Sequence, residues 1–395
     1  MDNTFLGVIY FIACSHALML AFALWNKSSR TSPTRWLTVI AFIICYKLFE
    51  GGALYTGLYT YVAHIMDFIP YMVLWIGPML WMYVRQVSGK PPLPPALLIA
   101  NFIPALAIWC LNAPSVFQHM DAKIMMWSSA LNTSSSELPV IAIALLLSIK
   151  VHLGIYLFAS WRVISRFKAA ASKLRADNST FILANMQFMV AAFFLLELLW
   201  VGLFAAQQTM GLLTLNAVSD IWLLFVGFMV LAIGYIGLQQ PGLVFTPEEC
   251  KLAEQQIQPD ASDTRGDTNV KYLHSALPDS TSEVLSQELE KQIKQQQLYL
   301  KDKLTLTDLA KATGIKAHTL SQVINQAMKT NFYKLINGYR VQHALELIEE
   351  PNQSWSLERI ALESGFSNRV TFNKAFKEVM ECTPSAYKKK IAQAS

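Results

Sequence analysis

Seven long apolar runs occupy the first 240 residues of the chain, and runs of about 20 such residues can cross a bilayer as helices. They are Phe5–Leu24, Trp36–Leu54, Val62–Val84, Ala96–Leu111, Pro139–Trp161, Phe181–Ala206 and Val218–Leu238. The fourth run is short and contains Pro104, and membrane helices tolerate internal proline better than soluble helices do. The sequence therefore predicts an all-α chain in which residues 1–240 form a seven-helix transmembrane domain.

The distribution of charge excludes a single soluble domain. The chain is 53% hydrophobic and 15% charged, whereas soluble domains carry about 25% charged residues. Residues 1–240 hold 13 basic and 8 acidic residues, and residues 241–395 hold 19 of each. The second part therefore has the composition of an ordinary soluble domain.

Basic residues in the loops between the runs predict the orientation in the membrane. Ten of them lie in the first, third and fifth loops: Lys27, Arg30, Arg35, Arg85, Lys90, Arg162, Arg166, Lys168, Lys173 and Arg175. The three opposite loops contain one, Lys123. Since basic loops stay in the cytoplasm, we expect a multi-pass protein of the inner (cell) membrane, with its N-terminus outside and its C-terminal domain cytoplasmic.

Ionisable residues within the apolar runs are candidates for intramembrane sensing, because charge at membrane depth is costly and by default suggests a functional site. Lys47, Asp67 and Glu197 are the residues that we single out, and Glu50, Lys150 and Asp220 share the property. The alternative is structural: such groups also form hydrogen bonds between helices or extend towards the membrane surface.

An acidic connector follows the apolar part. Residues 241–280 contain Pro241, Gly242, Pro247 and Pro278 around a polar run, which predicts a flexible linker. Residues 281–300 then have a helical stripe made of Val284, Leu285, Leu289, Ile293 and Leu298. This connecting amphipathic helix either docks on the next domain or pairs with a second copy of the chain in a homodimer.

Residues 301–395 contain two helix-turn-helix patterns joined by a longer helix. Thr305 and Asp308 have the spacing of a capping box, and Gly314 ends that helix before another begins near Ala317. The long helix covers Phe332 to Glu350, and the pattern then repeats around Gly365. Thr383 and Pro384 have the cap-then-proline order of a last helix.

This ordered set resembles the DNA-binding domain of the AraC/XylS family of bacterial transcription regulators. Its most specific matches are Glu363-Ser364-Gly365-Phe366-Ser367-Asn368, Phe372-Asn373-Lys374-Ala375-Phe376-Lys377 and Thr383-Pro384-Ser385-Ala386-Tyr387. Leu304–Ala310 is similar to the opening of the family's first helix, and Tyr339-Arg340-Val341 to its linker helix. The resemblance covers about a quarter of the chain and leaves the apolar part outside it.

The resemblance implies that two reader helices enter successive major grooves of promoter DNA. Carried over by position, the base-reading residues are His318, Ser321, Gln322, Arg369, Asn373 and Lys374. The phosphate-binding candidates are Lys311, Lys316, Lys329, Lys377 and the Lys388–Lys390 run, beginning with Lys388. Many family members have arginine where Gln322 stands, so the first unit either reads weakly or mainly positions the second.

No enzyme signature supports catalysis. The chain lacks the GxxxxGK[ST], GxGxxG, HExxH and GxSxG patterns, and its five cysteines have no metal-ligand spacing. We therefore expect no enzyme activity, no cofactor and no metal.

Our interpretation is a membrane-embedded one-component transcription regulator whose bundle is its sensor and anchor. Its expected partners are double-stranded promoter DNA, the lipid bilayer, RNA polymerase, an unknown small-molecule signal and a second copy of the chain. The alternative is a transporter-like or receptor-like membrane protein with a cytoplasmic protein-interaction tail.

Overall fold

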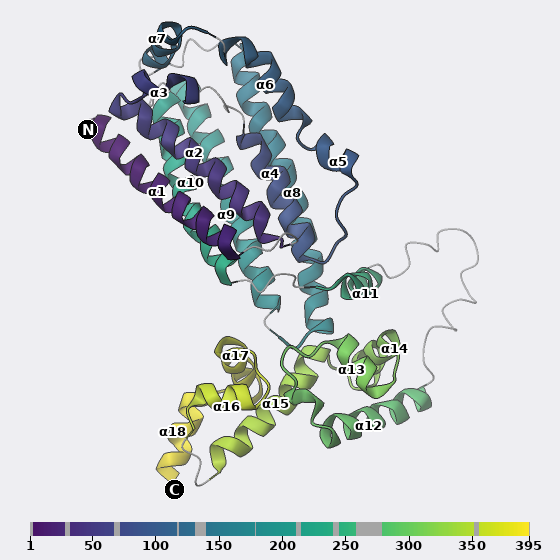
Figure 1. Ribbon diagram of the computed structural model, residues 1–395. Coiled ribbons are helices and arrows are strands. Elements are labelled where there is room, and N and C mark those ends of the chain that lie inside the picture. Colours follow the sequence, from purple (N-terminus) through teal and green to yellow (C-terminus); the bar gives the residue numbers. More distant parts are fainter. Residues whose placement is uncertain are drawn as a thin grey trace, which may run out of the picture. The chain divides into compact units, whose positions relative to one another are not determined.

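The computed structural model describes residues 3–27, 32–66, 72–116, 118–130, 140–177, 179–210, 215–239, 245–257, 279–350 and 355–394. Within these ranges the secondary structure is helical, and one isolated bridge joins Arg175 and Thr305. The all-α prediction is confirmed for the described part of the chain (Figure 1). The chain forms two compact units: Met1–Ser165 with Asn185–Thr246, and Arg166–Ala184 with Pro247–Ser395.

Four helices are long and apolar enough to cross a membrane. They are α1 (Asn3–Lys27), α2 (Thr34–Thr56), α8 (Val140–Leu174) and α9 (Ser179–Met210). The last predicted run forms α10 (Leu215–Gln239), whose described side chains include the shorter apolar stretch Ala217–Gly227. These five helices coincide with five of the seven predicted runs.

The third and fourth predicted runs differ from the prediction, because each contains more than one helix. The third is divided into α3 (Tyr59–Met66) and α4 (Val73–Val87), and the fourth into α5 (Pro95–Ala100) and α6 (Ile103–Val116), with α7 (Met120–Ala130) following. Pro95 and Pro104 explain the starts of α5 and α6, since proline lacks an amide hydrogen and fits the first turn of a helix. Hydropathy alone does not predict these interruptions between helices, because the residues on both sides of each one are apolar.

The α1–α2 pair is the most extensive helix contact of the first unit, and Figure 1 shows the two helices side by side. Gly51 and Gly52 of α2 face the rings of Tyr10 and Phe11 of α1. A Cβ atom at Gly52 would lie 2.9 Å from the Phe11 ring, so a larger residue would push the helices apart. Close approach at small residues is typical of membrane helices, whose association depends on packing.

The second unit contains a helix inside the predicted linker. It is α11 (Pro247–Ile257), which has proline at its first position and Glu248 and Glu249 in its first turn. The part of the predicted linker at residues 258–278 lies outside the described residues. The predicted connecting helix is α12 (Asp279–Gln295), followed by the short turn η2 (Leu298–Leu300).

Docking of α12 on its own domain is confirmed, since α12 packs against η3 (Val323–Ala327). Leu289 and Ile293 of its predicted stripe are buried, whereas Val284 is exposed. The remaining helices are α13 (Leu306–Thr313), α14 (Ala317–Gln322), α15 (Phe332–Glu349), α16 (Leu357–Glu363), α17 (Arg369–Met380) and α18 (Pro384–Ala394). They reproduce the predicted order of two helix-turn-helix units joined by one longer helix.

Candidate nucleic-acid interface

The second helix-turn-helix unit is formed by α16, a glycine turn and α17. Gly365 has φ of +81°, and a Cβ atom there would lie 2.7 Å from the carbonyl oxygen of Tyr299, so the turn requires glycine. Asn368 then caps α17 by accepting a hydrogen bond from the backbone amide of Thr371 at 2.9 Å. Phe372 and Phe376 anchor the inner side of α17 in the core.

Anchoring one side of α17 presents its opposite side to solvent. Arg369, Asn373, Lys374 and Lys377 are all exposed, as predicted for DNA-contacting residues. Lys374 has a distant ion pair with Glu378, with 3.9 Å between Nζ and Oε1. This face therefore combines cations with an amide, the side chains that suit guanine, adenine and phosphate.

The first helix-turn-helix unit exposes fewer of its predicted base-reading residues. The capping box is confirmed, since Thr305 Oγ1 accepts from the Asp308 amide and the Asp308 carboxylate accepts from the Thr305 amide. On α14, His318 is exposed and Gln322 is half-buried. Ser321 is 7% exposed and its carbonyl oxygen accepts a hydrogen bond from Asn325 Nδ2 at 2.8 Å.

The burial of Ser321 corrects its assignment as a base reader. Leu320 and Val323 are fully buried, and Ser321 lies next to them on the inward side of the helix. An assignment carried over by sequence position does not show which side of a short helix is buried. The first helix-turn-helix unit therefore offers His318 and Gln322 for contact with DNA.

The predicted phosphate-binding lysines are in different surroundings. Lys329 and Lys377 are exposed. Lys311 and Lys316 are also exposed and line a groove of about 330 Å³ that Glu248 of α11 shares. Lys388 is half-buried and donates a hydrogen bond to the Trp355 carbonyl oxygen at 2.7 Å, so its ammonium is held by the protein itself.

A buried arginine of the joining helix α15 forms a network that sequence reasoning missed. Arg340 is 1% exposed, and its guanidinium donates to the carbonyl oxygens of Tyr299 at 2.7 Å, Lys301 at 2.8 Å and Ala176 at 3.2 Å. Asn337 also donates to Ala176 O, at 3.1 Å. Ala176 lies in the loop between α8 and α9, so the second unit includes this loop as a structural part.

The same loop has its own ion-pair network. Arg175 pairs with Asp177 at 2.8 Å and with Glu249 of α11 at 3.0 Å. Burial disfavours the charged carboxylate of Asp177, but the hydrogen bonds and charge of Arg175 outweigh it and hold the pKa of Asp177 below its ordinary value. Burial lowers the pKa of Arg340 to about 10, which leaves it charged at neutral pH.

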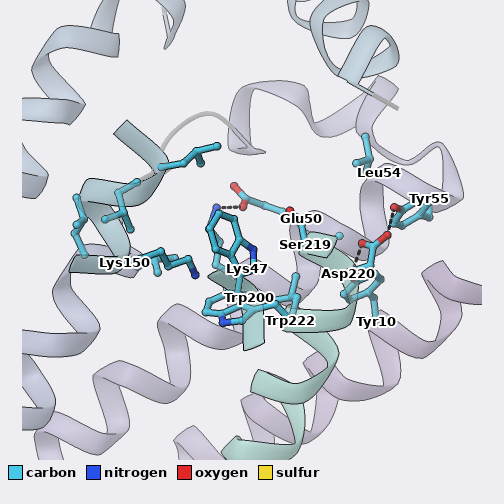
Figure 2. A pocket seen from close by; sticks show the side chains of 16 residues that line it. Tyr10, Lys47, Glu50, Leu54, Tyr55, Lys150, Trp200, Ser219, Asp220 and Trp222 are labelled. Atoms are coloured by element: carbon cyan, nitrogen blue, oxygen red, sulfur yellow. Dashed lines mark hydrogen bonds and ion pairs between the residues drawn. The ribbon is translucent and has the colours of Figure 1, made fainter. Parts of the chain in front are cut away.

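The predicted intramembrane residues also have definite positions. Lys47 forms an ion pair with Glu50, and Glu197 is buried and pairs with Lys150 at 3.1 Å. Trp222 Nε1 donates to Glu197 Oε1, also at 3.1 Å. Asp67 lies outside the described residues. Lys47 and Lys150 line one cavity of the first unit (Figure 2).

Comparison with known proteins identifies the class of the C-terminal part. Residues 309–390 match a family described as a helix-turn-helix domain. Over 97 residues the chain is 30% identical to the regulatory protein PocR of Salmonella typhimurium, which is 25% of this chain and 31% of PocR. Over 92 residues it is 26% identical to the uncharacterized HTH-type transcriptional regulator YdeC of Bacillus subtilis, which is 23% of this chain and 31% of that protein.

The similarity is confined to one region. An uncharacterized HTH-type transcriptional regulator of Staphylococcus aureus is 26% identical over 92 residues, which is 23% of this chain and 12% of that protein. The chain thus spans about a third or less of the length of these curated relatives. No solved structure matches the chain. Its C-terminal part thus matches a helix-turn-helix domain, and the relatives there are named as one regulatory protein and two HTH-type transcriptional regulators.

Proposed function

We propose that this chain is a membrane-embedded transcription regulator that reads promoter DNA with α17 and, more weakly, with α14. The observation that carries the proposal is the exposed face of α17, made of Arg369, Asn373, Lys374 and Lys377. In the proposed complex Arg369 contacts guanine, Asn373 contacts adenine, and Lys377 contacts phosphate. The relatedness of this region to transcription regulators supports DNA as the partner.

On α14, His318 and Gln322 supply the base contacts of the first unit. Lys311, Lys316 and Lys329 supply phosphate contacts around it. Because Gln322 is half-buried and neutral, we expect the first helix-turn-helix unit to contribute less to sequence preference than the second helix-turn-helix unit.

The membrane part of the proposal rests on the long apolar helices. Large apolar side chains point away from the protein on each of them, for example Met19 on α1, Ile155 on α8 and Phe188 on α9. Water would disfavour such a surface, whereas lipid chains would cover it without cost. We propose seven spans, with α3–α4 and α5–α6 as interrupted ones, and the DNA-binding domain in the cytoplasm.

The loop between α8 and α9 is the proposed route from sensor to reader. α8 and α9 supply the ends of this loop, and Ala176 in it accepts hydrogen bonds from Asn337 and Arg340 of α15. A shift of α8 against α9 would change these contacts, and α15 joins the two helix-turn-helix units. Such coupling needs two arrangements of the loop with different affinity for DNA.

Binding of the full-length protein in lipid nanodiscs to promoter fragments tests the proposal. The affinity should fall steeply with salt concentration, because each phosphate contact releases counterions. Arg369→Ala should cost about 1–3 kcal/mol on the preferred site and relax the preference at one base pair. Arg359→Ala is the matched control, since it removes one positive charge from the neighbouring helix α16, where Arg359 lies over the Trp355 ring.

An affinity that is absent, or that does not change with salt, would reject DNA binding and favour a membrane protein with a protein-interaction tail. A loss with Arg369→Ala that is equal on all sequences would make Arg369 a phosphate contact and not a base reader.

A further inference from the structure

The first unit contains a cavity of about 410 Å³ among α1, α2, α4, α8, α9 and α10. Much of its wall is apolar and includes Leu54, Leu74, Leu146, Ile149 and Leu223. Figure 2 shows that charged and aromatic side chains gather in the same space. Its volume is within the range of sites for small molecules, and apolar walls with a few polar groups are typical of such sites.

Glu50 and Asp220 line this cavity, and another carboxylate, Glu197, does not line it but pairs with the lining lysine Lys150. Two of these three carboxylates already have a cation. Glu50 pairs with Lys47, and Glu197 pairs with Lys150. The Lys150 ammonium also lies over the rings of Trp222, at 3.9 Å, and Trp200, at 4.5 Å. Both lysines are therefore engaged by the protein, and the two tryptophan rings already hold a cation.

The third carboxylate, Asp220, has hydroxyl partners in place of a cation. Tyr10 donates to Oδ1 at 2.6 Å and Tyr55 donates to Oδ2 (Figure 2). Among the described residues no lysine, arginine or histidine forms an ion pair with Asp220. The charged lining residues, two lysines and two carboxylates, balance one another, but Glu197 already neutralises Lys150, so counting Glu197 leaves one negative charge in excess around the cavity.

A negative charge inside a largely apolar cavity is costly unless a cation compensates it. The rings of Tyr10 and Tyr55 lie parallel, with centroids 6.0 Å apart, and their hydroxyls both donate to the carboxylate. Electron-rich rings and a carboxylate together favour an ammonium group. The leucine-rich wall accommodates an apolar body attached to that group.

We infer that this cavity binds a small organic ammonium compound, with its charged nitrogen at Asp220 and its apolar body against the leucines. Asp220 is near the start of α10, and Tyr55 is at the end of α2. In the proposed orientation both ends face the outside of the cell, so an extracellular amine reaches the site. The regulatory meaning of the site rests on the proposed sensor role, whereas binding itself does not.

A series of probes of similar shape and different charge tests the inference. Calorimetry on the full-length protein in nanodiscs compares 2-phenylethylammonium with neutral 2-phenylethanol, anionic 3-phenylpropionate and zwitterionic phenylalanine. We expect the ammonium to bind at least about tenfold more tightly than the other three. Equal binding of the alcohol, or stronger binding of the anion or the zwitterion, would overturn the inference without any variant.

Variants of the cavity residues then test whether Asp220 is the group that binds the ammonium nitrogen. Asp220→Asn should weaken the binding of 2-phenylethylammonium by about tenfold or more. The affinity for 2-phenylethanol should stay within about threefold of its original value. Asp121→Asn is the control, because the Asp121 side chain on α7 is 88% exposed. Tyr55→Phe keeps the carboxylate and should retain the preference for the ammonium. An unchanged ammonium affinity in Asp220→Asn would contradict the assignment.

Failure of this inference and failure of the proposed function have different signatures. Ammonium binding without any effect on DNA affinity would retain the site and reject its role in regulation. Salt-dependent DNA binding without charge selectivity at the cavity would retain the regulator and reject the ammonium site.

Discussion

Replacing Arg340 tests whether the α8–α9 loop is a structural part of the second compact unit, which contains the helix-turn-helix helices. The guanidinium satisfies three backbone carbonyl oxygens, those of Tyr299, Lys301 and Ala176. Arg340→Ala removes this donor from the Tyr299 and Lys301 oxygens, leaves the Ala176 oxygen with Asn337 as its remaining donor, and creates a cavity in a site where Arg340 is 1% exposed. A buried acceptor that loses its donor costs about 1–3 kcal/mol, so we expect a destabilisation of about 3–5 kcal/mol, near the upper limit for one substitution.

Hydrogen exchange measured by mass spectrometry on the full-length protein reports this change locally. A loss of about 3 kcal/mol corresponds to exchange roughly 150-fold faster in α15. Peptides that cover Ala176 should lose protection together with α15, because the Arg340 hydrogen bond is one of the two side-chain bonds that hold this loop on α15. Arg340→Lys should recover little of the lost protection, since an ammonium group cannot reproduce the planar arrangement of donors of a guanidinium group.

Lys334→Ala is the matched control, as Lys334 is an exposed cation on the same helix. It should change exchange in α15 by less than about 0.5 kcal/mol. An Arg340→Ala effect as small as this, or one that leaves the Ala176 peptides unchanged, would refute the reasoning.

Two further predictions concern glycine and pH. Gly365→Ala should destabilise the unit by clearly more than Gly314→Ala in thermal unfolding: both have positive φ, but a Cβ at Gly365 meets backbone atoms at 2.7 Å, whereas at Gly314 nothing lies within 4 Å. An equal loss of stability in the two variants would mean that the strain of a positive φ determines the cost and the clash at Gly365 does not. Asp177 has a lowered pKa in the folded state, so its contribution is complete above its unfolded pKa of about 3.9 and is lost as the pH falls through the lower folded value. Exchange in the loop should therefore rise on acidification through that window, and Asp177→Asn should abolish the dependence.

The local signals of the sequence predicted the helix-turn-helix part of the chain well. The capping box of Thr305 and Asp308 and the turns at Gly314 and Gly365 depend on residues a few positions apart, and all three are present. The sequence of α11 also contained its start signals, Pro247 followed by two glutamates. The polar residues that surround them led to the prediction of a flexible linker. Ser321 was assigned to base reading by its position in the sequence, which does not show that this side of the short helix α14 is buried.

The long-range contacts could not be predicted. Arg340 and Ala176 are 164 positions apart, and Tyr10 and Asp220 are 210 apart. No periodicity or motif relates such residues, and each contact exists because several helices pack at once. Hydropathy did indicate that Lys47, Lys150, Glu197 and Asp220 are unusual, but it could not indicate which of them pair.

The central claim is that one chain holds DNA while it remains in the membrane. The most direct measurement is to cross-link living cells, isolate the membrane fraction, and sequence the DNA recovered with the full-length protein. We predict enrichment of a small set of promoter fragments in that fraction, and its loss with Arg369→Ala but not with Arg359→Ala. Recovery of those promoters with a soluble C-terminal fragment, or no enrichment in any fraction, would contradict the claim.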